Sequence, residues 1–172
     1  MKRNIFLIGI MLLVMLSFVL ILKSCLSNDK SEQVTINQRK RLPAFTFYNL
    51  DSTRFSNINL GIGVNTCIIY FDPDCDFCES EISSIIANIT AFKNTQLLLI
   101  SFNSPEKIRA AEQKFKLNQF KNIRLLWDKD VQFDSLFGKS IIPSTFIYNK
   151  DQLLLKEYHG LVSIKAITQW LN

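Results

Sequence analysis

The longest apolar run of the chain stands near its amino end. Residues 5–22 read IFLIGIMLLVMLSFVLIL and carry no charge, so a helix here would extend about 27 Å, close to the thickness of the hydrocarbon core of a bilayer. Lys2 and Arg3 precede the run, and basic residues favour the cytoplasmic side of a membrane. We therefore predict that residues 1–24 form a membrane anchor or signal segment and that the rest of the chain faces the periplasm or the cell exterior.

A second form of attachment is open at the end of this run. LKSC, residues 22–25, resembles the lipobox at which bacterial lipoproteins are cut and lipidated, with Lys23 as an unusual residue for that pattern. Lipidation of Cys25 would make the protein a lipoprotein, held by acyl chains instead of a retained helix. Either form of attachment tethers the chain to a membrane.

The segment after the apolar run differs from everything that follows it. Residues 25–42 are polar and lack apolar periodicity, which predicts a flexible tether. Pro43 opens the folded part, in which AFTFYNL alternates like a strand and RFSNINL reads as the second strand of a hairpin. We therefore expect one domain over residues 43–172.

From residue 66 onward, patterns of buried strands alternate with helical patterns. TCIIYF, residues 66–71, is short, β-branched and aromatic, which is typical of a strand buried on both faces. Apolar residues then recur at helical spacing from Phe77 to Phe92. This alternation predicts an α/β fold with a mixed central sheet flanked by helices. Further strands are expected at 96–102, 123–128, 143–149 and 153–160, and further helices at 104–117, 130–138 and 163–172.

The net charge of +5 gives no reason to expect a nucleic acid as partner. Residues 1–42 hold seven Lys/Arg and two Asp/Glu, whereas residues 43–172 hold thirteen of each. The basic excess therefore belongs to the anchor and tether, and the predicted domain has no electrostatic reason to bind a polyanion.

Cys75 and Cys78 are separated by two residues and stand where the first buried strand ends and the first helix begins. Free amide groups at a helix start favour the thiolate form of a cysteine, and the thiolate is the form that attacks disulfides. We predict that Cys75 is the accessible nucleophile and that Cys78, one turn further along, is the shielded resolving cysteine. If the domain lies outside the cytoplasm, such a pair is oxidisable.

Acidic side chains surround this cysteine pair. Negative charge disfavours a thiolate and so opposes the effect of the helix start. Because a less stabilised dithiol gives up its electrons more readily, the sequence predicts a reductant of disulfides. The acids are Asp72, Asp74, Asp76, Glu79 and Glu81.

The cysteines could also bind a metal or form a structural link. Zinc needs four ligands, and beside the pair only Cys67, His159 and Cys25 could supply them. Cys67 lies inside a strand and is expected to be a small buried apolar residue, and His159 to be partly exposed. A purely structural link would close a tiny loop and stabilise little. Redox chemistry without a cofactor or metal is therefore preferred. A copper-binding module that uses Cys75, Cys78 and His159, and a non-catalytic surface module, stay open.

Pro143 is the second candidate feature. It opens a predicted strand after two isoleucines, and X-Pro bonds at such places are candidates for the cis form. Packed against a dithiol, such a proline would leave the neighbouring backbone free to pair with an incoming peptide. Taken alone, a proline that merely starts a strand fits the sequence as well.

Together these residues resemble the thioredoxin superfamily, and most of all its membrane-anchored TlpA/ResA-type thiol-disulfide oxidoreductases. The matching pieces are FDPDCDFC with its continuation ESEI, and IIPSTFIYNKD further along. The hairpin PAFTFYNLDSTRFSN and an extra αβ unit between dithiol and proline are similar too. Over residues 43–172 the resemblance implies a thioredoxin-like fold with an N-terminal β-hairpin and an αβ insertion.

The resemblance also implies roles for single residues. Cys75 matches the nucleophile, Cys78 the resolving cysteine, and Pro143 the cis-proline that faces the dithiol. Glu81 matches a glutamate that tunes the protonation of the thiols, although a solvated acid in the first helical turn fits the residues alone.

Three positions depart from the family's pattern. Asp74 stands where the family has Trp, and Phe77 where it often has Pro, so substrate preference and redox potential are not fixed by the resemblance. Ile69 stands where thioredoxins bury an acid, so Glu81 or solvent is expected to carry the proton during resolution.

Partners follow from the resemblance alone. It implies protein substrates with disulfides or cysteine pairs, recharging by a membrane electron donor, and a part in cell redox homeostasis. The haem-binding cysteine pair of apocytochrome c is one familiar substrate of that family.

Overall fold

The computed structural model describes residue 15, residues 40–139 and residues 141–171. The chain divides into two compact units, Met1–Arg39 and Lys40–Asn172, and the fold described here is that of the second. The predicted anchor, except for Met15, lies outside the described residues, as does the tether up to residue 39. Within the described part, no helix is both long and apolar enough to cross a membrane.

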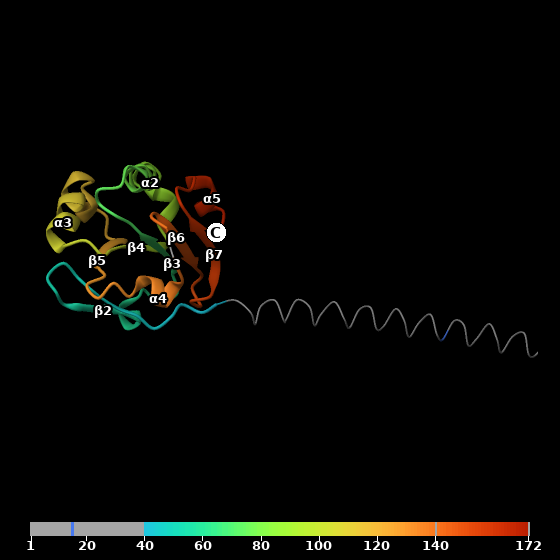
Figure 1. Cartoon of the computed structure of the whole chain (residues 1–172). Coiled ribbons are helices and arrows are strands. Elements are labelled where there is room, and N and C mark those ends of the chain that lie inside the picture. Colours follow the sequence, from blue (N-terminus) through green and yellow to red (C-terminus); the bar gives the residue numbers. More distant parts are fainter. Residues whose placement is uncertain (1–14, 16–39, 140, 172) are drawn as a thin grey trace, which may run out of the picture. The chain divides into compact units, whose positions relative to one another are not determined.

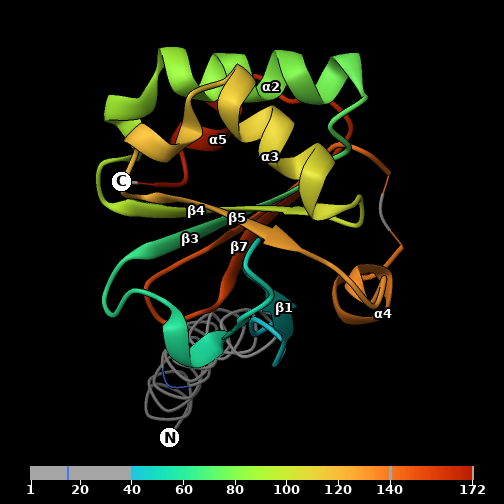
Figure 2. The ribbon, with the colours of Figure 1, turned by 90° about the vertical axis from the view of Figure 1, so that its left-hand side faces the viewer.

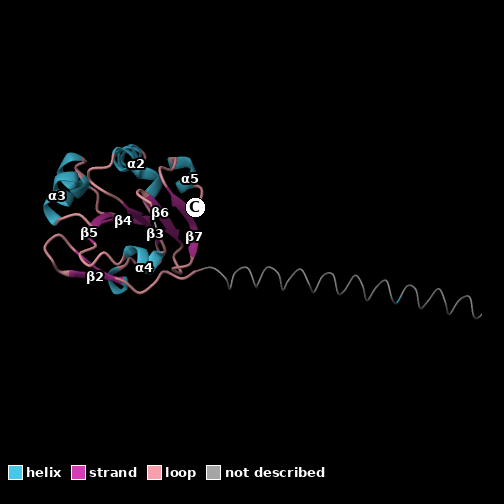
Figure 3. Ribbon diagram, in the orientation of Figure 1, coloured by secondary structure: helices cyan, strands magenta, loops and turns pink. Residues whose placement is uncertain are grey.

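The second unit is built on one mixed seven-stranded sheet in the order β2-β1-β5-β4-β3-β6-β7 (Figures 1 and 3). The three central strands β3, β4 and β5 run parallel, and every other neighbouring pair is antiparallel. The strands are β1 (Thr46–Tyr48), β2 (Arg54–Ser56), β3 (Asn65–Tyr70), β4 (Thr95–Ser101), β5 (Ile123–Trp127), β6 (Ser144–Tyr148) and β7 (Leu154–His159). The helices are α2 (Asp76–Ala87), α3 (Pro105–Lys114), α4 (Phe133–Phe137) and α5 (Ile164–Thr168), with 3-10 turns η1 (Asn57–Asn59), η2 (Ile89–Phe92) and η3 (Leu117–Gln119).

Helices cover both faces of the sheet, as the alternating patterns predict. Figure 2 shows α2, α3 and α5 together above the sheet and α4 below it. The alternation of side chains along β3 explains why both faces need cover: Cys67 and Ile69 belong to the core under α2, whereas Ile68 and Tyr70 belong to the core on the α4 face. All four residues are at most 5% exposed.

Aromatic rings dominate the core on the α4 face. The ring of Phe133 stacks on Tyr70 with 3.9 Å between centroids and on Phe137 with 4.4 Å. Gly138 ends α4 with φ at +93°, a conformation that side-chain-bearing residues rarely adopt. The hairpin β1–β2 contributes further rings to this core, including the fully buried Phe47.

The compact unit begins at Lys40, slightly before the boundary at Pro43 that the sequence suggested. The Leu42 N–H donates to the Gln152 carbonyl at 2.8 Å, and the Leu154 N–H donates to the Lys40 carbonyl at the same distance. Leu42 is buried. The last residues assigned to the tether therefore pair with the turn between β6 and β7.

Candidate functional site

Cys75 occupies the N-cap position of α2, directly after the loop that follows β3. Its N–H donates to the Asp72 carbonyl at 3.1 Å, and its carbonyl accepts from the Glu79 N–H at 3.0 Å. The Asp72 carboxylate also accepts from the Asp74 N–H at 2.9 Å, which closes a tight turn before the helix. The turn holds Cys75 at the helix start with its side chain partly exposed.

Cys78 lies one turn further along α2 and is 1% exposed. Both cysteines are free thiols. Burial raises the pKa of the Cys78 thiol to about 12; the neighbouring Cys75 and Glu81 act in the same direction, and a hydrogen bond from the Asp72 backbone opposes them. One cysteine is therefore accessible and the other is shielded and holds its proton.

Glu81 is fully buried beneath the helix start, at 0% exposure. Thr145 of β6 donates its hydroxyl to Glu81 Oε1 at 2.6 Å. Within the described part, Oε2 makes no hydrogen bond of normal geometry, although the nearby Val162 backbone N–H favours the charged form. Burial outweighs both groups and raises the pKa of Glu81. The interpretation of Glu81 as a solvated first-turn acid is therefore wrong.

Two of the acids around the dithiol form ion pairs with lysine side chains. Helix α3, which belongs to the extra αβ unit, places Lys107 against Asp74 and Lys114 against Glu79 as ion pairs. These pairs are largely exposed, so each contributes little to stability. The two lysines do offset part of the negative charge beside the cysteines. The five acids therefore disfavour the thiolate less than the sequence alone suggests.

Pro143 is buried directly before β6, and the Ile142–Pro143 peptide bond is cis. The next residue, Ser144, pairs with Tyr70 at the end of β3, the strand that leads into the Cys75 loop. Sheet topology therefore brings Pro143 to the same end of the sheet as the dithiol. Cys78 belongs to the core cluster under α2, and both Ile142 and Cys75 pack against that cluster.

His159 does not join the two cysteines. Its Nδ1 lies 3.0 Å from the Ser144 hydroxyl, and its ring packs edge-on against Phe146 on the α4 face of the sheet. Cys78 lies on the opposite face. Among residues 40–139 and 141–171, no three His, Cys, Asp or Glu side chains are grouped to hold a metal ion. Cys67 is fully buried, and burial raises the pKa of its thiol far above the ordinary value.

Most of the chain matches one known protein family. The model of the AhpC/TSA family matches residues 39–156, well over half of the chain. The chain belongs to the AhpC/TSA family. Among curated proteins, none matches the sequence significantly.

Solved structures with the thioredoxin-like fold resemble this AhpC/TSA protein. A solution structure from Neisseria meningitidis, described as a candidate thioredoxin, is 26% identical with a TM-score of 0.63, over 77% of this chain and 87% of that one. StoA from Bacillus subtilis is 13% identical with a TM-score of 0.58, over 76% and 98%. A secreted Mycobacterium tuberculosis disulfide oxidoreductase, homologous to DsbE of E. coli, is 18% identical with a TM-score of 0.62, over 74% and 93%. Family and fold together assign the chain to the thioredoxin-like oxidoreductases.

Three side chains at the site of this AhpC/TSA protein were missed by sequence reasoning. Thr145 follows Pro143 by two residues, and strand alternation turns its side chain towards α2. That alternation was a usable signal, because a polar residue on a buried face needs a partner. Lys107 and Lys114 gave no such signal, since only the packing of α3 brings them to Asp74 and Glu79.

Proposed function

We propose that this protein reduces disulfides of protein substrates outside the cytoplasm, with Cys75 as the nucleophile and Cys78 as the resolving cysteine. The observation that carries the proposal is the contrast between the two sulfurs at one helix start. Cys75 is partly exposed at the N-cap of α2, whereas Cys78 is buried and its thiol pKa is raised to about 12.

The reaction proceeds in two exchanges. The Cys75 thiolate attacks one sulfur of the substrate disulfide; a mixed disulfide forms, and the other substrate sulfur leaves as a thiolate that takes up a proton. Cys78 then loses its proton and attacks the Cys75 sulfur, which releases the second substrate thiol. Two electrons have passed to the substrate, and Cys75 and Cys78 end as a disulfide. Glu81, buried beside Cys78 with a raised pKa, is the group that takes the Cys78 proton.

Burial of Cys78 is compatible with the reducing direction, and the reduction potential decides it. Strongly oxidising dithiols are those whose reduced form is stabilised. With a thiol pKa of about 12, Cys78 gives the reduced form no thiolate stabilisation near neutral pH. The measurement is the reduction potential against glutathione. A value of about −270 mV supports the proposal, and a value of about −120 mV contradicts the reducing direction.

Large apolar side chains near the dithiol support a polypeptide substrate. Phe77, between the two cysteines, is 63% exposed, and Ile141, close to the cis bond, is 59% exposed. Leu161 is 50% exposed. It follows Gly160, where an added Cβ would lie 3.7 Å from Ile141 Cδ1. Exposed apolar surface of this kind is typical of a contact with another protein.

The cellular setting is part of the proposal and depends on the apolar run at residues 5–22. Such a segment, or lipid on Cys25, would hold the domain on the outer side of a membrane. A membrane electron donor would then recharge the dithiol, and cysteine pairs such as those of apocytochrome c would be substrates. One structural neighbour is described as secreted, which agrees with this setting.

The test is reduction of insulin by the full-length chain in detergent, with dithiothreitol as electron source. We expect turnover by the wild type and by Cys67→Ser, a matched control for a buried cysteine outside the site. Cys75→Ser should lose the activity. Equal rates for wild type and Cys75→Ser would show a non-catalytic module.

A further inference from the structure

Strand β5 has an open edge over its amino-terminal half. On one side it pairs with β4 from Ile123 to Trp127. On the other side it pairs with β1 at a single position, Tyr48 opposite Trp127, because β1 ends there and the chain turns away. The part of β5 before Trp127 therefore has no strand neighbour on the β1 side.

Unpaired backbone groups point out of this edge. The Asn122 carbonyl accepts a hydrogen bond from the Leu97 N–H of β4, and the Asp128 N–H donates to the Ser101 carbonyl of β4. In a parallel strand, every second residue forms its backbone hydrogen bonds with the same neighbouring strand. Residues 123, 125 and 127 consequently turn their backbone groups the other way. Ile123 N–H donates to the Phe120 carbonyl at 3.1 Å. Within the described part of the chain, nothing pairs with the N–H or C=O of Leu125 on this side.

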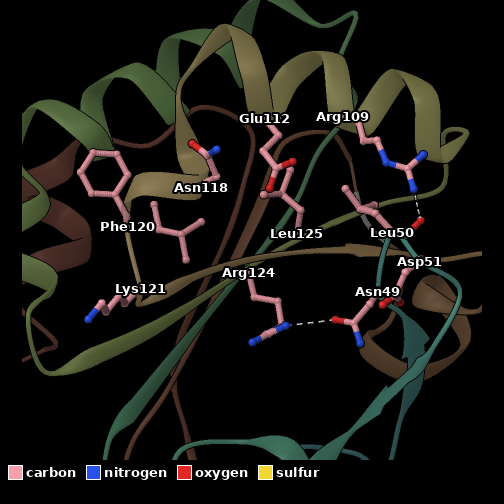
Figure 4. A pocket seen from close by; sticks show the side chains of 11 residues that line it. Asn49, Leu50, Asp51, Arg109, Glu112, Asn118, Phe120, Lys121, Arg124 and Leu125 are labelled. Atoms are coloured by element: carbon pink, nitrogen blue, oxygen red, sulfur yellow. Dashed lines mark hydrogen bonds between the residues drawn. The ribbon is translucent and has the colours of Figure 1, made fainter.

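A cavity of about 610 Å³ runs along the same edge (Figure 4). Its volume falls in the range of ligand-binding clefts. Arg109 and Glu112 of α3 form one wall, and the turn after β1, with Asp51, forms the other. Arg109 also donates to the Leu50 carbonyl, which fixes the two walls to each other. The floor is formed by Ile123, Arg124 and Leu125 of β5.

Positive charge gathers at the amino-terminal end of β5. Arg124 donates to the Asn49 side chain at 3.1 Å and lies over the ring of Phe55, so its guanidinium is held in place. A second cavity of about 280 Å³ shares Lys121 and Arg124 with the first and adds Lys93; no carboxylate lines it. An anionic group here would meet three cations.

We propose that the open edge of β5 binds an extended segment of a partner polypeptide, which adds to the sheet as a short antiparallel strand. Edge addition satisfies unpaired N–H and C=O groups directly. At about 3.3 Å per residue, positions 123–126 pair with roughly four residues of the partner. In the antiparallel direction the carboxyl end of the segment reaches Lys121 and Lys93, so this end is acidic.

The probe is a panel of fluorescent hexapeptides with alternating Thr and Val at the first four positions and Glu, Gln or Lys at the last two. Binding to the full-length chain in detergent is measured by anisotropy. We expect the Glu peptides to bind at least about tenfold more tightly than the Lys peptides. Methylation of the backbone nitrogens that face β5 should abolish binding, whereas methylation of those on the other edge should not.

Protein variants and amide exchange locate the site. Lys121→Glu should weaken binding of the Glu peptides by about tenfold. Lys150→Glu, an exposed charge change on the turn between β6 and β7, should leave binding unchanged. Bound peptide should slow hydrogen exchange of the Leu125 amide. Because no turnover is needed, Cys75→Ser should bind as the wild type does, which keeps this test independent of the proposed function.

Three results would overturn the proposal. The first is that no panel peptide binds more tightly than about 1 mM. The second is binding that ignores backbone methylation or leaves Leu125 exchange unchanged. The third is a dimer of the chain that already protects this amide without peptide, since the edge would then be occupied by a second copy.

Discussion

Replacement of Thr145 by valine isolates the hydrogen bond under the dithiol. The side chains of Thr145 and Glu81 are fully buried. Within the described part of the chain, the Thr145 hydroxyl donates to Glu81 Oε1 at 2.6 Å and Oε2 makes no hydrogen bond of normal geometry. Valine has nearly the same shape as threonine, so the change removes the donor and leaves the packing almost intact. Both carboxyl oxygens of Glu81 would then lack a normal hydrogen bond.

The size of the effect depends on the charge of Glu81. A hydrogen bond to a charged group contributes about 1.5–3 kcal/mol, and one between neutral groups about 0.5–1.5 kcal/mol. Thr145 lowers the pKa of Glu81 and burial raises it. Because the Thr145 bond favours the charged carboxylate, its removal costs more free energy of unfolding where Glu81 is ionised, at high pH.

The assay is urea unfolding of wild type, Thr145→Val and Thr145→Ser from about pH 4 to pH 9. We expect the valine variant to lose about 1 kcal/mol at the acid end and roughly 2–3 kcal/mol at the alkaline end. Serine keeps the hydroxyl and should show little dependence on pH beyond that of the wild type. A loss that is the same at every pH, or the same for valine and serine, would refute the reasoning.

Three further predictions address the core, the charges and the protons. Phe133→Ala removes a fully buried ring that stacks on Tyr70, and should lower the free energy of unfolding by about 3–5 kcal/mol in urea; a loss below about 1 kcal/mol would contradict this packing. Lys107→Gln frees a carboxylate beside the dithiol, so the reaction with the anionic disulfide of Ellman's reagent should slow at low salt and recover at high salt, whereas Lys150→Gln should react as the wild type. Since Cys78 keeps its proton up to about pH 12, the reduction potential should keep falling by at least about 30 mV per pH unit above pH 9, and a flat profile there would contradict the raised thiol pKa.

Much of the fold could be predicted because its strands are buried on both faces. The run at residues 66–71 had no polar alternation, and the structure places it as β3 between β4 and β6. The segment with helical spacing after it forms α2, and the hairpin predicted from AFTFYNL and RFSNINL is the β1–β2 hairpin. These elements follow local rules of periodicity and turn chemistry, which act over a few residues.

Features that depend on tertiary packing could not be predicted in the same way. The resemblance marked Glu81 as a site residue, but by residue type alone it also fits a solvated helical acid. Only the position of β6 against α2 buries it with Thr145. Likewise, the acidic residues around the cysteines give no sign of Lys107, because the separate helix α3 brings it to Asp74. The open edge of β5 exists because β1 is too short to cover it, and strand ends are the least predictable part of a pattern.

Cys75 and Cys78 differ in accessibility, so alkylation can show which sulfur attacks and which resolves. The reduced full-length chain is treated with substoichiometric iodoacetamide, and the label is located by mass spectrometry. We predict labelling of Cys75 well before Cys78 and Cys67, and, in Cys78→Ser, a stable mixed disulfide with a substrate protein through Cys75. Labelling of Cys78 as fast as Cys75, or a mixed disulfide at any other cysteine, would contradict these roles.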